Sequence, residues 1–475
     1  MPKVKIKIND REYEVEQGLT VLEAAEKVGI EIPHFCAHKY LKPAGLCRMC
    51  LVEIKGARKL QTSCTTPVQE GMEVYTESEA VVKARREILE LHLANHPLDC
   101  PECDQAGDCY LQKYYDKYGL YERRFYIERT HFEKNVILAD NLILDRERCI
   151  LCLRCVRFAE EILGEKMLAV FERGSKSYIS TYDGEKIDTL YSGNFAEICP
   201  VGAITDRKHR FKIRNWFLEK RESICPLCER GCNIYVETPK DRSYLKMYDR
   251  VQRISSRDNP DVNKSFICDR GRYELFALEE NRIRKGIYEM EEVGWQKIKR
   301  ILKEHLFTAE TVILSSWMTN EEIDLALSLF KDYLNLKNIY YWGRADGDED
   351  EILIKKDKNP NSYYLKNKKK IKRLSAKSKA EFSGSIIIFG DFFEDNKFVL
   401  EKIDSKSFVI LITPYIPSNP ERINLLIPSA NFFEKEGSYT NFEGKVQQVK
   451  RVFSPEKVKS EYEILKIMES ILREK

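Results

Sequence analysis

The sequence lacks any apolar run long enough to cross a membrane, and it lacks a strong excess of charge of either sign. Its longest apolar runs, residues 385–389 and 408–412, are far shorter than the roughly 20 residues of a membrane-spanning helix. The formal net charge is only +3 although 33% of the residues are charged, so no global field favours nucleic acid as a partner. The N-terminal residues alternate apolar and charged side chains and lack the apolar core of a signal peptide. We therefore expect a cytoplasmic protein that reaches a membrane only through partners.

No cysteine of this chain lies outside a metal-ligand pattern. In a reducing compartment, closely spaced C-x2-C pairs bind metal or do redox work rather than form disulfides. The fifteen cysteines divide into four groups, and His96 completes the group that has only three thiols. The four predicted ligand sets are Cys36, Cys47, Cys50 and Cys64; His96, Cys100, Cys103 and Cys109; Cys149, Cys152, Cys155 and Cys199; and Cys225, Cys228, Cys232 and Cys268.

The first two sets have the spacing of different iron–sulfur sites. The first, C-x10-C-x2-C-x13-C, resembles a [2Fe–2S] ferredoxin site, although plant-type chains have four residues where this one has ten. Four thiolates also suit tetrahedral zinc, so zinc is the alternative there. The second, H-x3-C-x2-C-x5-C, predicts a [4Fe–4S] site in which an imidazole replaces one thiolate and raises the potential. His92, one helical turn before His96, is the rival ligand, and we interpret it as a residue of the helix face.

The third and fourth sets each predict one further [4Fe–4S] cluster. The third is C-x2-C-x2-C closed by the distant Cys199 of a Cys-Pro pair. Ala159 stands where two-cluster bacterial ferredoxins carry the cysteine of a second cluster, so this unit is expected to hold only one. The fourth, C-x2-C-x3-C with Cys268, is the pattern found at the head of molybdopterin oxidoreductases.

Residue patterning predicts several domains in a chain of 475 residues. Two alternating segments joined by Asn9-Asp10 predict a β-hairpin, and Thr20 with Glu23 predicts a helix capping box. A helix at about residues 79–94 is expected to leave His96 on an exposed loop before Pro97. Strands alternating with a helix predict a parallel α/β sheet in the C-terminal part. Those strands are expected at residues 311–315, 338–341, 385–388 and 408–412, and the helix at 319–334.

Three stretches carry a family resemblance. Residues 91–109, LHLANHPLDCPECDQAGDC, and residues 195–205, FAEICPVGAIT, are similar to the G subunit of bacterial NADH-quinone oxidoreductase, the respiratory complex I. Residues 427–447 resemble the segment that closes the molybdopterin-oxidoreductase-like part of that family. The order of the four ligand sets matches as well.

The resemblance implies a multidomain α+β and α/β fold. A β-grasp [2Fe–2S] ferredoxin-like domain is expected first, then a helical segment for the cluster with one histidine and three cysteine ligands. A single-cluster [4Fe–4S] ferredoxin-like unit, a [4Fe–4S] head and a shortened, degenerate molybdopterin-oxidoreductase-like α/β part follow. The corresponding boundaries are residues 1–78, 79–140, 141–220, 221–275 and 276–475.

The resemblance also implies a function, that of an electron-relay subunit without a substrate site of its own. Its expected cofactors are one [2Fe–2S] and three [4Fe–4S] clusters. Its expected partners are a flavin- and NADH-binding subunit, a [2Fe–2S] subunit and connecting subunits near the quinone, in the peripheral arm of a proton-translocating complex at the inner membrane.

The alternatives are a subunit of an NAD-linked formate dehydrogenase, the diaphorase subunit of a hydrogenase, and a zinc-binding interaction protein. No thiol remains for molybdenum or tungsten, and Arg270 stands where molybdopterin enzymes of this type commonly have lysine. We therefore expect no such cofactor.

Overall fold

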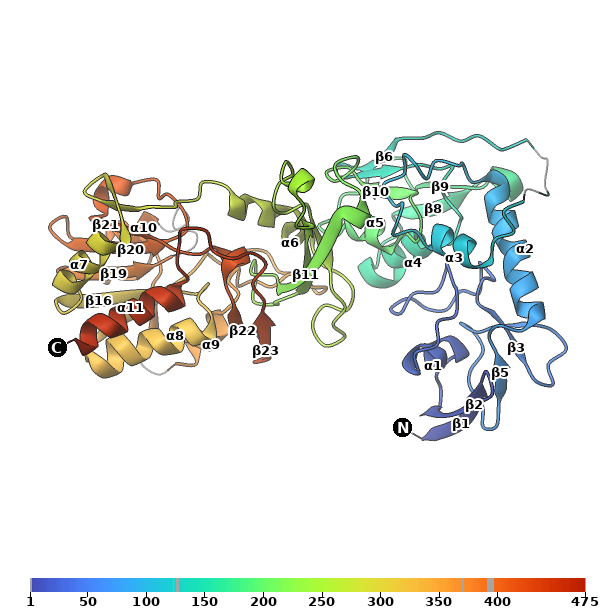
Figure 1. The fold of residues 1–475 in the computed structure, drawn as a ribbon, viewed down its shortest axis with the longest axis horizontal. Helices are drawn as coiled ribbons and strands as arrows, with labels where there is room; N and C mark the ends of the chain where they lie inside the picture. The colour runs from blue at the N-terminus through green and yellow to red at the C-terminus, as the bar shows by residue number, and fades with distance from the viewer. Residues whose placement is uncertain (1, 123, 125–127, 369–370, 391–396, 475) are drawn as a thin grey trace. The chain divides into compact units, whose positions relative to one another are not determined.

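The computed structural model describes residues 2–122, 124, 128–368, 371–390 and 397–474. The chain forms two compact units, Met1–Leu218 and Glu219–Lys475, which are drawn in Figure 1 and considered separately below. Among the described residues, no helix combines the length and the apolar character needed to span a bilayer.

The first unit begins with a five-stranded sheet. The predicted hairpin is confirmed, because Asn9 and Asp10 have positive φ angles of 48° and 65° and reverse the chain between two paired strands. The capping box is also confirmed, since Thr20 and Glu23 exchange both of its hydrogen bonds. The sheet order is β2-β1-β5-β3-β4, with β1 and β5 parallel. The elements are β1 (Lys3–Ile8), β2 (Arg11–Glu16), α1 (Val21–Lys27), β3 (Leu51–Ile54), β4 (Gln61–Thr62) and β5 (Glu73–Tyr75).

Short helices and strands complete the first unit. The helix predicted before His96 is α2, which Ser78 caps through a hydrogen bond from Val81 N. A three-stranded sheet of order β10-β7-β6 and the hairpin of β8 and β9 follow. The elements are α2 (Glu79–Asn95), α3 (Tyr110–Tyr118), β6 (Val136–Ala139), β7 (Leu142–Leu144), α4 (Arg154–Phe158), β8 (Leu168–Phe171), β9 (Tyr178–Thr181), α5 (Asn194–Ile198) and β10 (Ile204–Asp206).

The second unit begins with a small sheet and continues into a larger one. The small sheet has the order β11-β12-β13 and is followed by α6. The larger sheet has the order β15-β14-β21-β20-β19-β16-β17-β18, in which β16 to β21 run parallel to one another and β14 is antiparallel to β21 and β15. The early elements are β11 (Leu218–Ile224), β12 (Asn233–Pro239), β13 (Arg253–Ser256), α6 (Asp269–Tyr273), β14 (Gly286–Tyr288) and β15 (Glu291–Val293).

The four predicted strands are all confirmed as strands of this larger sheet, and the predicted helix is confirmed beside it. Helix α8 continues into a π-helical turn, Ser328–Tyr333, so the helical run from 319 to 334 changes its hydrogen-bond pattern midway. The elements are α7 (Trp295–His305), β16 (Ala309–Ser315), α8 (Asn320–Leu327), β17 (Asn338–Trp342), α9 (Ser362–Lys366), β18 (Lys372–Arg373), β19 (Ser385–Phe389), α10 (Lys397–Glu401), β20 (Phe408–Thr413), β21 (Leu425–Pro428), β22 (Gly437–Thr440), β23 (Val446–Val449) and α11 (Glu461–Arg473).

Helices cover both faces of the larger sheet (Figure 1). Alternate strand residues such as Val312 and Ile387 pack with α7, α8 and α11 in one buried cluster. The intervening residues, such as Ile313 and Ile388, pack with α10 in a second cluster. Because both faces are buried, these strands are nearly continuous apolar runs, as expected for a parallel sheet.

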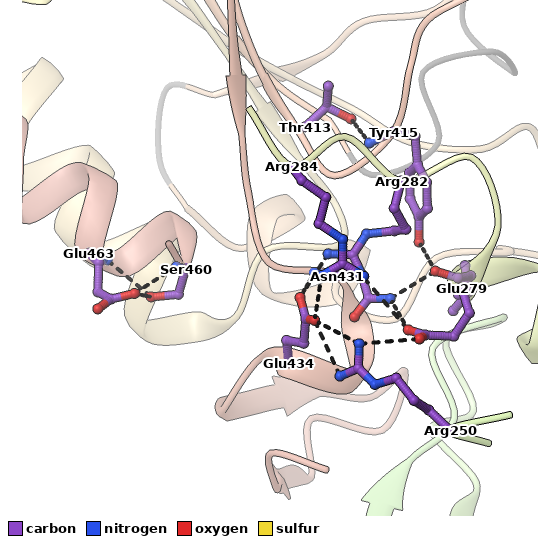
Figure 2. Close-up of polar contacts among 11 residues, drawn as sticks. Arg250, Glu279, Arg282, Arg284, Thr413, Tyr415, Asn431, Glu434, Ser460 and Glu463 are labelled. Atoms are coloured by element: carbon purple, nitrogen blue, oxygen red, sulfur yellow. Dashed lines mark hydrogen bonds and ion pairs between the residues drawn. The ribbon is translucent and has the colours of Figure 1, made fainter. Parts of the chain in front are cut away.

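A buried ion cluster fixes the segment that follows β21. Glu434 is fully buried, and its carboxylate forms ion pairs with the guanidinium groups of Arg282 at 2.7 Å, Arg250 at 3.4 Å and Arg284 at 3.9 Å (Figure 2). Asn431 forms a capping box with Glu434 and donates to Glu279 at 2.7 Å. These contacts join the closing segment to residues about 150 positions earlier in the chain.

Candidate metal centres

The first ligand set lies on the loops around β3 and β4. Cys50 Sγ and Cys64 Sγ are 3.4 Å apart, and the backbone N–H groups of Phe35 and Cys36 donate to Cys47 Sγ at 3.4 Å. Hydrogen bonds from the Cys47 and Cys64 thiols hold the pKa of Cys36 far below its usual range. The same hydrogen bonds to Cys36 raise the pKa of Cys47 and of Cys64. The structure therefore brings all four predicted side chains together and favours the thiolate form, which binds metal, at Cys36.

The second set surrounds a cavity of about 340 Å³. His96 ends helix α2, Cys109 precedes α3, and both side chains line this cavity with Cys100. His96 Nδ1 is buried and has no hydrogen-bond partner among the described residues. Burial, with a smaller effect of Arg148, lowers the pKa of His96 to about 4, so its imidazole is neutral at pH 7 as a metal ligand must be. The ring is half-buried, and the expectation of an exposed loop position is corrected because the cavity walls cover it.

Cys103 and His92 occupy different positions from the residues that line this cavity. Burial raises the pKa of Cys103, and the nearby charge of Cys100 acts in the same direction, so the two thiols are electrostatic neighbours. His92 instead packs edge-on against the Phe35 ring at 5.2 Å and is absent from the cavity lining. Of the two histidines, His96 is the one that lines the cavity with Cys100 and Cys109.

The third set lines a single small apolar cavity. All four cysteines contribute to its wall, which Ile150 and Ile179 help to complete. Leu151 and Leu153 alternate with these cysteines and have φ angles of 51° and 59°, a left-handed conformation that is rare for branched apolar residues. The loop therefore curls tightly enough for its thiols to face a common point. Burial raises the pKa of these four thiols, to about 12 for Cys149.

The fourth set lines a comparable cavity within the second unit. Its wall contains all four predicted cysteines together with Leu353, Ile354 and Lys358 of the α/β part. The backbone of Cys225 donates to Cys232 O at 2.8 Å, which closes the loop between them. Burial raises the pKa of Cys225 and Cys232 well above the ordinary thiol value.

These electrostatics indicate how the sites would take up metal. Buried thiols with raised pKa values are protonated in the metal-free protein, so binding must displace their protons. In the third and fourth sets the thiols line a cavity. Four convergent thiols are the donor set that an iron–sulfur cluster uses, so the residues of these two sites fit such a group.

Two glycines that sequence reasoning missed are required by these sites. A Cβ atom added to Gly202 would lie 2.2 Å from Cys103 Sγ, and one added to Gly271 would lie 3.1 Å from Cys225 Sγ. Each glycine follows the last cysteine of a set by three residues, as Cys199-Pro-Val-Gly202 and Cys268-Asp-Arg-Gly271. The shared Cys-x2-Gly spacing is the sequence signal for these two glycines. It has a physical reason, because only glycine allows the backbone to approach the sulfur so closely.

The fold and the four sets define a multi-site iron–sulfur protein, and comparison with known families agrees. Residues 1–79 match a 2Fe-2S iron-sulfur cluster binding domain, and residues 85–124 match the NADH-ubiquinone oxidoreductase-G iron-sulfur binding region. Residues 140–205 match the ferredoxin-like domain of NADH-quinone oxidoreductase subunit 3. Residues 218–276 match a molybdopterin oxidoreductase Fe4S4 domain, and residues 355–469 match molybdopterin oxidoreductase.

Individual relatives show the similarity in more detail. The G subunit of NADH-quinone oxidoreductase from Streptomyces coelicolor is 36% identical over 74% of this chain and 42% of that protein. Subunit 3 of the Thermus thermophilus enzyme is 38% identical over 64% of this chain and 42% of that protein. A crystal structure of NAD+-reducing [NiFe]-hydrogenase in the H2-reduced state has 32% identity, with 44% of this chain and 90% of that chain covered at a TM-score of 0.41. The chain is similar to the oxidoreductase subunits that include the G subunit of NADH-quinone oxidoreductase, and it spans about two fifths of the length of these curated relatives.

The molybdopterin oxidoreductase match raises the question of a pterin cofactor. In open α/β sheets, ligands bind beyond the carboxyl ends of the parallel strands. There, Asn361 donates to Met318 O at 2.9 Å and to Asn320 at 3.0 Å, while Ser316 donates to Trp342 O at 2.7 Å. These described polar side chains are buried and hydrogen-bonded to one another or to the backbone, and the prediction assigns all fifteen cysteines to the four sets. The residues at this edge of the sheet therefore do not fit such a cofactor.

Proposed function

We propose that this chain is the iron–sulfur electron-relay subunit of an NADH-quinone oxidoreductase. In this proposal the sixteen side chains of the four sets hold one [2Fe–2S] and three [4Fe–4S] clusters. The chain has no substrate site of its own, which makes it a non-catalytic subunit of a proton-translocating enzyme. When bound, the clusters would supply one-electron redox chemistry.

The observation that carries this proposal is the shared walls of neighbouring sites in the first unit. Tyr110 N, directly after Cys109, donates to Pro200 O, directly after Cys199, at 2.9 Å. Gly202, from the third-site segment, lies against Cys103 of the second site. Sites that share their walls are what a relay requires, whereas isolated structural metal sites have no need of such contacts.

The residues of each site have separate roles in this proposal. His96 binds as a neutral imidazole and removes one negative charge from the ligand shell, which raises the potential of the second cluster. The apolar walls of the third site exclude water and strengthen electrostatic interactions inside it. Gly202 and Gly271 provide the space that the sulfur atoms need.

The proposed partners and location follow from the family. The relatives are named as subunits of NADH-quinone oxidoreductase, so we propose a flavin- and NADH-binding subunit as electron donor. A [2Fe–2S] subunit and connecting subunits near the quinone complete the proposed neighbourhood. The chain would then lie in the peripheral arm of the membrane complex, on the cytoplasmic side.

Iron and sulfide analysis of anaerobically reconstituted protein tests this proposal. We expect about 14 irons and as many acid-labile sulfides per chain, from one binuclear and three tetranuclear clusters. Matched Cys→Ala variants, one in each set, should each lose only the iron of their own cluster. Iron near zero with stoichiometric zinc would refute the relay function, and stoichiometric molybdenum with formate-dependent dye reduction would favour a formate dehydrogenase.

A further inference from the structure

Arg154 in helix α4 is a buried cation without an acidic partner. Its side chain is 4% exposed, and no carboxylate in the described part of the chain pairs with it. The other buried arginines of this unit differ, because Arg148 lies 3.0 Å from Asp99 and Arg85 lies 3.2 Å from Glu77. A buried charge is costly unless an opposite charge compensates it, so the environment of Arg154 is incomplete as it stands.

The contacts of Arg154 join three of the metal centres. Its Nη2 donates to Ala37 O at 2.5 Å, its Nη1 donates to Ile198 O at 3.4 Å, and its guanidinium lies 5.3 Å from the centre of the Tyr110 ring. Each of these partners adjoins a proposed cluster ligand in the sequence, as Arg154 itself does. The adjoining ligands are Cys36, Cys199, Cys109 and Cys155 respectively.

The negative charge that is missing around Arg154 is the one that occupied clusters would bring. Thiolate ligation places anionic sulfur in the first and third sites, whose loops this guanidinium contacts. The charge of Arg154 affects the nearby thiols. Burial raises the pKa of Cys199, and the positive charge of Arg154 acts in the opposite direction. Burial likewise raises the pKa of Cys152, and both Cys36 and Arg154 contribute to that pKa, so the three groups lie within electrostatic reach.

We propose that Arg154 is a positioning residue that supplies a shared counter-charge to the first and third clusters and holds their two loops together. This inference rests on the proposed relay function. A fixed positive charge stabilises the reduced, more negative form of a cluster. Arg154 should therefore raise the midpoint potentials of both clusters at once and keep them matched to each other.

Arg157 provides a matched control from the same helix. Its Nη1 donates to Lys42 O at 2.6 Å and its Nη2 donates to Cys36 O, so it contacts the same first-site loop. Unlike Arg154, it is partly exposed, and within the described ranges neither of these hydrogen bonds reaches the third-site segment around Cys199. Solvent screens an exposed charge, so its removal should affect the first cluster weakly and the third cluster hardly at all.

The test is an EPR-monitored redox titration of the reconstituted full chain and of Arg154→Met, Arg154→Lys and Arg157→Met. Arg154→Met should lower both midpoint potentials, by about a tenfold change in the equilibrium constant for reduction, which is 59 mV for a one-electron couple. Arg154→Lys keeps the charge and should retain most of both potentials. Arg157→Met should leave the third potential unchanged.

Wild-type potentials in a cluster-loaded Arg154→Met protein would overturn the inference. Equal shifts in Arg154→Met and Arg154→Lys would also overturn it, because the shape of the side chain rather than its charge would then matter. If Arg154→Met binds too little iron to titrate, Arg154→Gln and Arg154→Lys decide by their iron content. Retention of iron by lysine alone supports the counter-charge, and equal loss refutes it. Absence of both signals from wild-type protein would refute the relay function itself, which is a separate result.

Discussion

Substitution of Glu434 by alanine should destabilise the second unit strongly. Its carboxylate is fully buried and lies 2.7 Å from Nη2 of Arg282, which is itself only 3% exposed (Figure 2). Without Glu434, Arg282 keeps a single carboxylate among the described residues, that of Glu279 at 3.6 Å. The substitution therefore leaves a buried cation poorly compensated, which is among the costliest consequences of a single mutation.

The expected magnitude follows from burial. Removing one partner of a buried pair costs about 3–5 kcal/mol. We expect the lower limit, about 3 kcal/mol, because Arg250 and Arg284 are 29% and 36% exposed and water can solvate them once Glu434 is gone. Since about 1.4 kcal/mol corresponds to a factor of ten, the ratio of folded to unfolded protein should fall on the order of a hundredfold.

Tryptophan fluorescence during denaturant titration provides the assay. Trp317 and Trp342 are buried in the second unit, so they report its unfolding. Glu279→Gln is the control, because this carboxylate is 21% exposed and lies 3.5 Å from Arg250 and 3.6 Å from Arg282. The control should cost less than about 1 kcal/mol. If Glu434→Ala shifts the midpoint no further than the control does, the ion cluster does not stabilise this unit as reasoned.

Three further predictions concern the metal centres and acid stability. His96→Cys should retain a tetranuclear cluster but lower its potential on the order of 100 mV, because a thiolate adds negative charge; an unchanged EPR titration would remove His96 as a ligand. Cys228→Ala should reduce the thermal stability of the second unit more than NADH–quinone turnover, since α/β residues form part of the wall of its site; lost turnover in a fully assembled complex would contradict this. Burial opposes ionisation of Glu237, but Arg253 at 2.7 Å outweighs burial and lowers the pKa of this carboxyl. The ionised Glu237 therefore stabilises the folded protein above about pH 4.3, and this stabilisation is lost as the pH falls. Glu237→Gln should therefore flatten the acid limb of the stability profile, and an unaltered limb would refute the linkage.

Local patterns predicted local structure well. The hairpin at Asn9-Asp10, the capping box at Thr20 and the end of α2 before His96 each depend on neighbouring residues, and each is confirmed. The strands of the parallel sheet could be predicted from the sequence because both faces of the sheet are buried, which makes each strand a continuous apolar run. The π-helical turn after α8 was not predicted, because the helical periodicity of the sequence does not distinguish it from an α-helix.

The sequence did not indicate the surroundings of the candidate sites. The cavity wall of the fourth site includes Leu353, Ile354 and Lys358, more than 80 residues after the last cysteine of that set. The burial of His96 was also missed, since a position before proline indicates a loop but not what covers it. Such features depend on segments that meet only in the folded chain.

Ligand spacing along the chain predicts the membership of the four sets, because most of the ligands of a cluster come from closely spaced positions. The order of those sets also indicated the family. What surrounds the sets became visible only in the folded chain: Gly202 lies against Cys103, Glu434 joins three arginines, and Arg154 lies among the segments of three sites. The difference is one of range. Most ligand spacings extend over a few residues, whereas burial, hydrogen bonds and ion pairs join segments more than 100 positions apart, as with Arg154 and Ala37 or Arg282 and Glu434.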